Sequence, residues 1–119
     1  MILTKDAILK ATDLSKQIVE VPEWGGSVYV RQMTAADRDA YEAECYPIDV
    51  KTGTATIRRD NLRARLLSRT LCDESGSLLF SAADVESLGG KSSDVLEKLY
   101  HEARSINGML AKADDGPKN

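Results

Sequence analysis

Several residue types and patterns on which catalytic or membrane functions depend are scarce in this sequence. Aromatic residues make up 5% of its 119 residues, and there is one histidine, His101. A zinc site needs several His or Cys ligands at close spacing, and His101 has none near it in sequence. The longest apolar runs are a few residues long, far short of the roughly 20 that span a bilayer. The first residues show no basic stretch followed by a long apolar one, so we expect no secretion signal.

Cysteine is also rare, with Cys45 and Cys72 far apart in the sequence. A disulfide framework in so small a chain uses more cysteines at paired spacing. Free cysteine is among the most buried residue types in proteins. We therefore expect both residues to be reduced thiols in the core of a cytoplasmic protein.

No strong charge of either sign is present. Sixteen Lys and Arg stand against nineteen Asp and Glu, which gives a net charge of -3. Such a mild acidic balance provides no overall attraction to nucleic acid or to an anionic membrane. The hydrophobic fraction of 42% is ordinary for a globular protein, and 119 residues suffice for one domain with a real core.

Local patterns along the chain predict a β-hairpin and several helices. Residues 17–21 and 27–33 alternate between polar and apolar side chains, and Gly25 and Gly26 between them reach positive φ without strain. Two tetrapeptides, 34–37 and 81–84, have the spacing of a helix-capping box. Helices are expected at about residues 4–11, 34–45, 58–72, 81–88 and 92–106.

These elements together predict an α+β fold that is mostly α. We expect a single domain over residues 1–110, with an N-terminal β-hairpin and about four to five α-helices. Residues 47–56, with Gly53 and three threonines, are typical of a mobile loop. Residues 111–119 are small, polar and charged and include Pro117, which predicts a flexible C-terminal tail.

The sequence contains no recognisable catalytic motif. His101 falls on the charged side of the last predicted helix, where a solvated side chain is expected. Residues 89–92 read Gly-Gly-Lys-Ser and resemble the end of a phosphate-binding loop, but the upstream glycine and the preceding strand are missing. We therefore predict no catalytic, metal-binding or cofactor-binding residue, and no enzymatic activity.

The two central predicted helices carry opposite charges. The helix at 34–45 is mostly acidic, whereas the helix at 58–72 holds five arginines and one aspartate. Because their charges are opposite, we expect the two helices to pair, within the domain or between subunits. Binding of nucleic acid is disfavoured, because leucines on both sides of the basic helix leave only a narrow basic stripe. The residues expected to take part in self-association are Asp37, Glu44, Arg63 and Arg65.

Two apolar features beside turns are candidates for binding a partner protein. Trp24 lies at the hairpin tip, where it either anchors a partner or folds back over its own hairpin or the core. The short run of Leu78, Leu79 and Phe80 is flanked by turns and offers an apolar edge.

Three stretches, in their order and spacing, resemble the tail assembly chaperones of long-tailed, siphovirus-type bacteriophages and prophages. The first is VEVPEWGG at 19–26, followed by VYVR at 28–31 and the acidic helix start at Thr34. The second runs through residues 71–89, and the third joins Lys91 and Ser92 to the amphipathic helix and Asn107-Gly108. Together they cover most of the chain, apart from the 47–56 loop and the tail.

This resemblance implies a small protein without a cofactor that works in the cytoplasm of the bacterial host. It implies binding to the tape measure protein before the tail tube polymerises, assembly into a homo-oligomer, and absence from the mature virion. It also implies a longer form of the protein made by a ribosomal frameshift. The alternatives are a structural tail or head-tail joining component that stays in the particle, and a small helical regulatory protein, which would need a recognition helix with a clear basic face.

Overall fold

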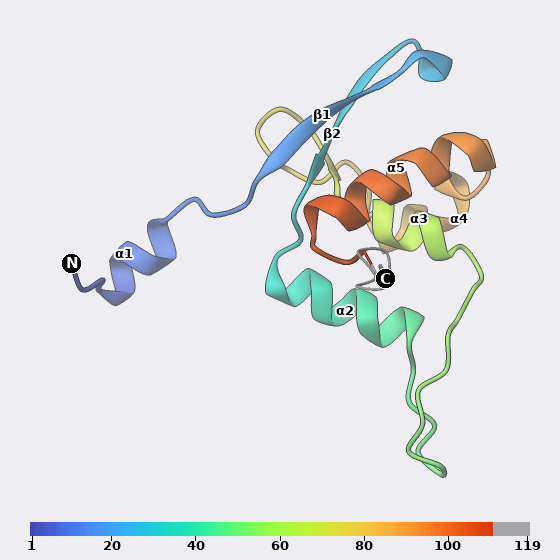
Figure 1. Cartoon of the computed structure of the whole chain (residues 1–119), viewed down its shortest axis with the longest axis horizontal. Coiled ribbons are helices and arrows are strands. Elements are labelled where there is room, and N and C mark those ends of the chain that lie inside the picture. The colour runs from blue at the N-terminus through green and yellow to red at the C-terminus, as the bar shows by residue number, and fades with distance from the viewer. Residues whose placement is uncertain (111–119) are drawn as a thin grey trace, which may run out of the picture.

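The computed structural model describes residues 1–110 and confirms the predicted α+β class (Figure 1). Five α-helices and three strands form within these residues, and the strands make an antiparallel sheet in the order β1-β2-β3. In chain order the elements are α1 (Lys5–Lys10), β1 (Lys16–Val21), a 3-10 turn (Pro22–Trp24), β2 (Gly26–Arg31), α2 (Ala35–Cys45), α3 (Leu62–Leu67), β3 (Leu71–Cys72), a second 3-10 turn (Ala82–Asp84), α4 (Val85–Leu88) and α5 (Ser93–Ile106). The tail predicted for residues 111–119 lies outside the described residues.

The predicted hairpin is confirmed in strands β1 and β2. The strands pair from Lys16 opposite Arg31 to Val21 opposite Gly26. A single 3-10 turn joins them and ends at Gly25, whose φ of 78° would strain a residue with a side chain. Val21 and Val30 are fully buried, so one face of the hairpin covers the core while its tip extends beyond it (Figure 1).

The helix predicted at 58–72 is wrong in extent. Helix α3 occupies only Leu62–Leu67, and it follows Asn61, which adopts a left-handed φ of 54°. After α3 the chain turns, and β3 pairs with β2 instead of continuing the helix. Leu71 and Cys72 are both buried, so pairing and burial against an earlier strand override the helical spacing of the leucines.

The predicted helix starts are confirmed by their capping hydrogen bonds. The side chains of Thr4, Thr34 and Ser92 each accept a bond from a backbone N–H in the first turn of the helix that follows. Ser81 and Asp84 form the complete reciprocal capping box. Asp37, three residues after Thr34, instead directs its carboxylate to arginines on other elements.

Helix α5 packs on the sheet and on α3 to close the core. Its buried residues are Val95, Leu96, Leu99 and Ala103, which share one face at helical spacing. Both cysteines are free and buried, as predicted. At the sheet edge, the Lys98 ammonium donates a hydrogen bond of 2.6 Å to the backbone carbonyl of Glu20 on β1.

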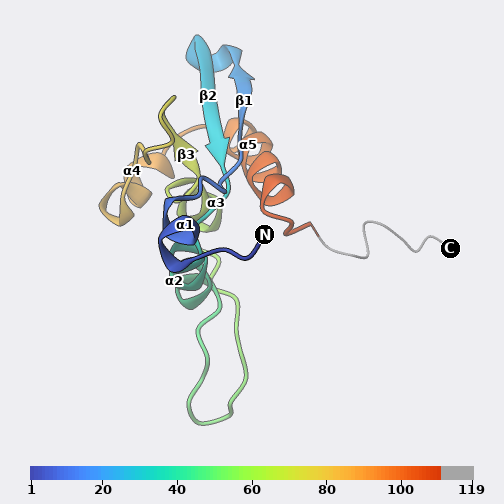
Figure 2. The same cartoon turned by 90° about the vertical axis from the view of Figure 1, so that its left-hand side faces the viewer.

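Two segments lie away from this core (Figures 1 and 2). Helix α1 stands off at one side and has no buried residue. The loop between α2 and α3 extends as a narrow arm, and its two sides are joined where Asp49 N–H donates to the Thr54 carbonyl at 2.8 Å. Within residues 1–110, no helix combines the length and the apolar character needed to cross a bilayer.

Candidate functional site

The hairpin tip and the segment before α4 together form an apolar hollow. Trp24 and Phe80, distant in the sequence, both line it, together with Leu88 of α4. The hollow, called here the tip hollow, has a volume of about 550 Å³ and is lined by Glu23, Trp24, Phe80, Ser87, Leu88 and Lys91. Two of the predicted partner-binding residues thus lie in one place.

Local structure fixes both aromatic side chains. Trp24 closes the 3-10 turn between β1 and β2, where Gly25 reverses the chain. Phe80 follows an extended segment that lies beside β3, because the Leu79 N–H donates to the Leu71 carbonyl at 3.0 Å. Ser81, the next residue, is held by its capping box with Asp84. The hollow therefore has walls set by backbone hydrogen bonds.

The other two residues of the predicted apolar edge lie elsewhere. Leu78 is half-buried and forms a bridge with Cys72, and Leu79 is 50% exposed; neither lines the tip hollow. Trp24 and Phe80 are each half-buried and pack against the core. Of the two positions expected for Trp24, the structure shows the one in which the side chain folds back against the core. Part of its ring still lines the tip hollow.

The opposite charges of the central segments meet within the chain. Arg69, just after α3, donates to Asp37 at 3.3 Å and to Glu44 at 2.8 Å. Arg31 of β2 binds the second oxygen of Asp37 at 3.1 Å and the Gly76 carbonyl at 2.7 Å. Asp37 and Glu44, two of the four residues predicted to support self-association, are therefore already engaged by arginines of the same chain.

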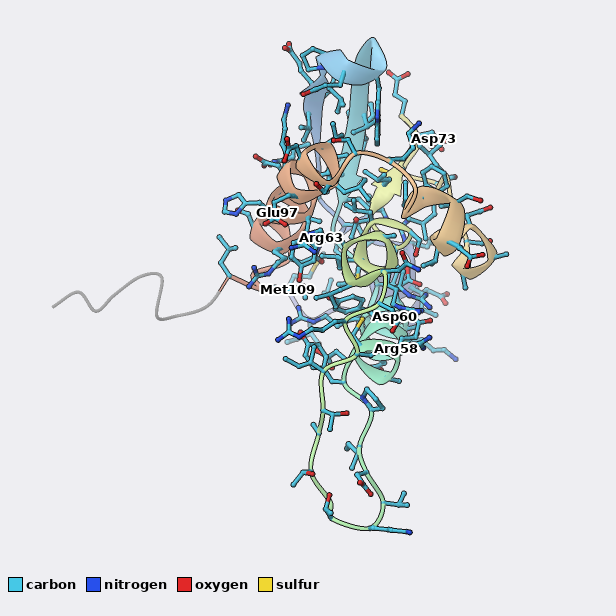
Figure 3. The ribbon with its side chains drawn as sticks, turned by 90° about the vertical axis from the view of Figure 1, so that its right-hand side faces the viewer. Arg58, Asp60, Arg63, Asp73, Glu97 and Met109 are labelled. Carbon is cyan, nitrogen blue, oxygen red and sulfur yellow. The ribbon has the colours of Figure 1, made fainter. Side chains whose placement is uncertain are left out.

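The remaining two of those residues pair with other acids. Arg63 binds Glu97 of α5 (Figure 3). Arg65 binds Asp60 at 2.9 Å. Asp60 also accepts from Arg58 at 2.8 Å, and these two arginines lower the pKa of its carboxyl to about 2. Asp37 and Glu44 thus bind Arg69, whereas Arg63 and Arg65 bind acids outside α2.

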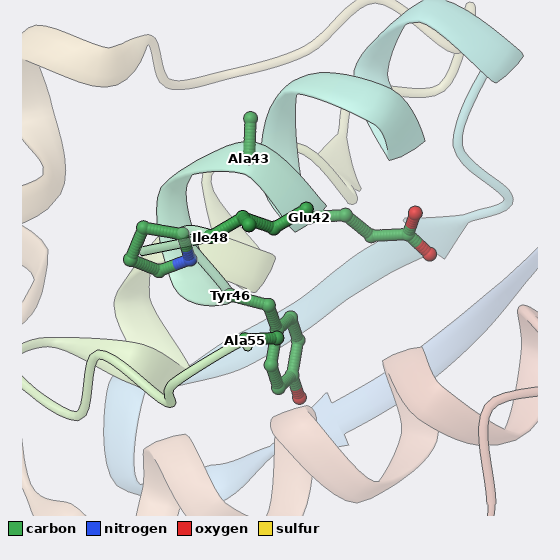
Figure 4. Close-up of a pocket in the computed structure, with 6 residues that line it drawn as sticks. Glu42, Ala43, Tyr46, Ile48 and Ala55 are labelled. Atoms are coloured by element: carbon green, nitrogen blue, oxygen red, sulfur yellow. The ribbon is translucent and has the colours of Figure 1, made fainter. Parts of the chain in front are cut away.

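A second apolar hollow, not predicted from the sequence, lies between the end of α2 and the long loop (Figure 4). This loop groove has a volume of about 630 Å³ and is lined by Glu42, Ala43, Tyr46, Pro47, Ile48 and Ala55. Ile48 is well exposed, as is Val50 farther along the loop. The signal in the sequence was the presence of β-branched apolar residues, Ile48, Val50 and Ile57, in an otherwise polar loop.

The structure also places the residues that the sequence offered for metal binding, thiol chemistry and phosphate binding. Among residues 1–110, no cluster of three or more His, Cys, Asp and Glu side chains could hold a metal ion. Burial raises the pKa of both the Cys45 and Cys72 thiols, which opposes formation of a reactive thiolate. His101 is exposed on α5, and Gly89 and Gly90 end α4 rather than following a strand.

Comparison with known proteins shows a family and a solved structure to which the chain is similar. A family model described as phage tail assembly chaperone matches residues 4–119. Among solved structures, that of the bacteriophage HK97 tail assembly chaperone is similar, with a TM-score of 0.60 and 21% sequence identity over 89% of this chain and 95% of the other. At this identity the structural likeness shows a shared fold. No curated protein sequence matches the chain at a significant level.

Proposed function

Because the chain belongs to the phage tail assembly chaperone family, we propose that it binds the tape measure protein and helps the tail tube assemble. It acts by binding rather than by catalysis, in the cytoplasm of the bacterial host, and is absent from the mature virion. The observation that carries this proposal is the tip hollow, where Trp24 and Phe80 present half-buried aromatic surface between fixed walls.

The hollow suits an amphipathic helix as its ligand. A long, largely helical tape measure protein exposes apolar stripes until the tube encloses it, and exposed apolar stripes aggregate. Helices of this kind bind by placing apolar side chains in a hydrophobic groove. Trp24 and Phe80 supply the apolar contact, and Glu23 and Lys91 at the hollow supply charges of both signs for the polar side of such a helix.

The small free energy of binding available at one tip hollow indicates that several copies act together. Complete burial of a large apolar side chain contributes about 1.5 to 3 kcal/mol, and both aromatic side chains are already half-buried. Loss of translational and rotational freedom costs roughly 4 to 15 kcal/mol on association. One hollow therefore binds weakly, and stable coverage of a long partner requires linked copies whose contacts add through effective concentration. We propose a homo-oligomer, joined by a longer frameshifted form of the same protein.

Co-expression with the tape measure protein from the same genome tests the proposal. The tagged chain should retain the tape measure protein on a column and increase its soluble fraction. The double variant Trp24→Ala, Phe80→Ala should lose both effects. The control Ile18→Ala changes an exposed residue of the same hairpin outside the hollow and should behave as the unaltered chain.

Equal retention by the double variant, with an unchanged unfolding midpoint, would show that the tip hollow is not the binding surface. Failure of the unaltered chain to retain or solubilise the tape measure protein, alone and with its frameshifted form, would reject the function. Mass spectrometry of purified virions tests the proposed absence of the protein from the mature virion. The chaperone should be absent, whereas a structural tail or head-tail joining protein would be present in stoichiometric amount.

A further inference from the structure

A second hollow, polar and positively charged, adjoins the tip hollow. Helices α3, α4 and α5 lie together on this side of the molecule (Figure 1). The hollow between them, called here the basic hollow, has a volume of about 210 Å³, and its lining includes Arg59, Asn61, Arg63, Gly89, Lys91 and Ser93. No acidic residue of the described chain lines it. Lys91 also lines the tip hollow, so the two hollows share one wall.

The positive charges of the basic hollow are largely uncompensated. Among residues 1–110, neither Arg59 nor Lys91 takes part in an ion pair, and both are exposed. Arg63 binds Glu97 of α5 (Figure 3), and its guanidinium lies over the Tyr100 ring at 5.6 Å from the ring centre. Both members of that pair are about half exposed, so solvent screens their attraction. The hollow therefore gathers three cations against one acid outside its lining.

Backbone geometry holds the walls of the basic hollow in place. Asn61 adopts a left-handed φ of 54° just before α3, and its side chain lies against Gly89 at the end of α4. The N–H groups of Gly89 and Lys91 donate to the carbonyls of Val85 at 2.9 Å and Leu88 at 3.1 Å. A ligand that enters the hollow thus has to order side chains and not the backbone, which lowers the entropic cost of binding.

We propose that the basic hollow receives an acidic side chain of the same partner helix whose apolar side chain occupies the tip hollow. This inference rests on the proposed function and names the chemistry of the partner, which is an amphipathic helix with Asp or Glu beside its apolar anchor. Residues three, four or seven positions apart share one face of a helix, so one helix reaches two adjoining hollows. Hydrogen bonds from Arg and Lys to a carboxylate are charge-assisted and stronger than those between neutral groups.

The charges around the two hollows also give the bound helix a direction. Glu23 lies at the tip hollow on the hairpin side, whereas Arg59 and Arg63 line the basic hollow on the α3 side. A helix that lies across both hollows therefore places its acid toward α3 and gains from a basic residue toward the hairpin. The reverse orientation brings like charges together, and like-charge contacts of this kind suppress wrong modes of binding.

The size and surroundings of the basic hollow favour a carboxylate over nucleic acid. Its volume of about 210 Å³ lies below the roughly 300 to 1,000 Å³ of small-molecule pockets, so it suits one side chain rather than a nucleotide. Asp60 and Asp94 adjoin lining residues in the sequence, and Glu97 pairs with one of them; all three acids are exposed. A phosphate backbone carries charge at every step and meets these acids, whereas a single carboxylate does not.

Peptide binding to the purified full chain tests the inference. The probes are overlapping synthetic peptides that cover the tape measure protein of the same genome, with any tryptophan replaced by phenylalanine. Trp24 is the single tryptophan of the chain and lines the tip hollow, so its fluorescence reports binding. The peptides that bind should carry Asp or Glu three, four or seven positions from an apolar anchor. Replacement of that acid by its amide should weaken binding about three- to tenfold at low salt.

The matching change on the chain is Arg59→Gln with Lys91→Gln. In this variant the change from acid to amide in the peptide should alter binding by less than about twofold, because the carboxylate has already lost its partners. Glu97→Gln should instead tighten binding about twofold, since it releases Arg63. In about 1 M salt, where the screening length is about 3 Å, these differences should largely disappear while the apolar contact remains.

Matched controls separate the basic hollow from net charge. Lys51→Gln with Arg58→Gln removes the same two residue types at exposed positions outside both hollows. This control should bind the peptides as the unaltered chain does, and all variants should keep its unfolding midpoint. A peptide whose acid is changed to an amide on the opposite face of the helix should also bind without loss.

Three results would overturn the inference. The first is an equal effect of the acid-to-amide change on the unaltered chain and on the Arg59→Gln, Lys91→Gln variant. The second is tighter binding of a single-stranded oligothymidylate than of any peptide. The third is the absence of peptide binding while the co-expressed tape measure protein is still retained. Retention is measured separately, so these results leave the proposed function standing, whereas loss of both retention and peptide binding by the unaltered chain would reject the two together.

Discussion

The side chain of Asn107 accepts a hydrogen bond from the backbone N–H of Met33 at 2.8 Å and so ties the end of α5 to the chain just after β2. The same amide donates to the carbonyl of Ala103 at 2.8 Å and to that of Arg31 at 3.4 Å. One side chain therefore caps a helix and closes the junction between that helix and the sheet.

We expect Asn107→Ala to lower the free energy of unfolding by about 1 to 3 kcal/mol, because it leaves the partly buried Met33 N–H without a partner. Ser105→Ala, at an exposed position on the same helix, should change it by less than about 0.5 kcal/mol. Urea unfolding followed by circular dichroism measures both values. Equal values for the two variants would show that the junction does not depend on this amide.

Asp37 should be the most important acid for stability, because its two oxygens bind Arg31 and Arg69. The side chains of these arginines are only 13% and 18% exposed, so removal of the shared carboxylate leaves two poorly solvated charges. Asp37→Ala should cost about 2 kcal/mol, less than for a fully buried pair because Glu44 and the Gly76 carbonyl remain as partners. Glu42→Ala, which breaks the exposed pair with Arg38, should cost less than about 0.5 kcal/mol in the same urea titration.

Gly89 packs closely against Asn61, the residue with the left-handed φ before α3. A Cβ at position 89 would lie 2.2 Å from the Asn61 side-chain oxygen. Gly89→Ala should therefore force this exposed side chain to turn away and destabilise the protein by about 0.5 to 1 kcal/mol. Asn61→Gly removes the obstructing side chain and suits a φ of 54°. The double variant should therefore recover most of the loss, and a thermal double-mutant cycle measures this coupling. Additive losses would mean that Asn61 moves aside at no cost.

Asp60 should make stability depend on pH in the acidic range. Its bonds to Arg58 and Arg65 lower the pKa of its carboxyl from 3.8 to about 2. The ionised form is favoured in the folded state, so the stabilisation is complete above pH 3.8 and is lost as the pH falls toward 2. The difference in unfolding midpoint between the unaltered chain and Asp60→Asn should therefore be constant above pH 3.8 and decrease as the pH falls toward 2. It should shrink with added salt, because the group is exposed, and should vanish when both arginines are replaced by glutamine.

The elements that the sequence predicted well are those fixed by neighbouring residues. The hairpin depends on alternation and on Gly25, and the helix starts depend on Thr4, Thr34, Ser81 and Ser92, all of which act within a few residues. Strand β3 was missed because Leu71 and Cys72 take their conformation from β2, which lies much earlier in the chain. A row of leucines compatible with a helix cannot show that its last members belong to a sheet.

The candidate site was predicted in its residue types but not in its arrangement. Pairing between acidic and basic segments was expected, yet the arginine of the basic segment that binds acids of α2 is Arg69, which lies beyond the end of α3. Trp24 and Phe80 were chosen as separate apolar features, and only the fold brings them to one hollow. The loop groove was missed because it depends on an antiparallel β-bridge between Ile48 and Ala55. The polar, glycine-containing sequence of the loop gives no pattern from which this bridge could be predicted.

The bond from Lys98 to the Glu20 carbonyl has a consequence for the open edge of the sheet. An edge strand with free backbone groups is a template on which further strands add, and β1 is such an edge. The Lys98 ammonium occupies one of its carbonyls and places a charge beside it. Addition of a further strand at this edge, the route to amyloid-like growth, is thereby obstructed at Glu20.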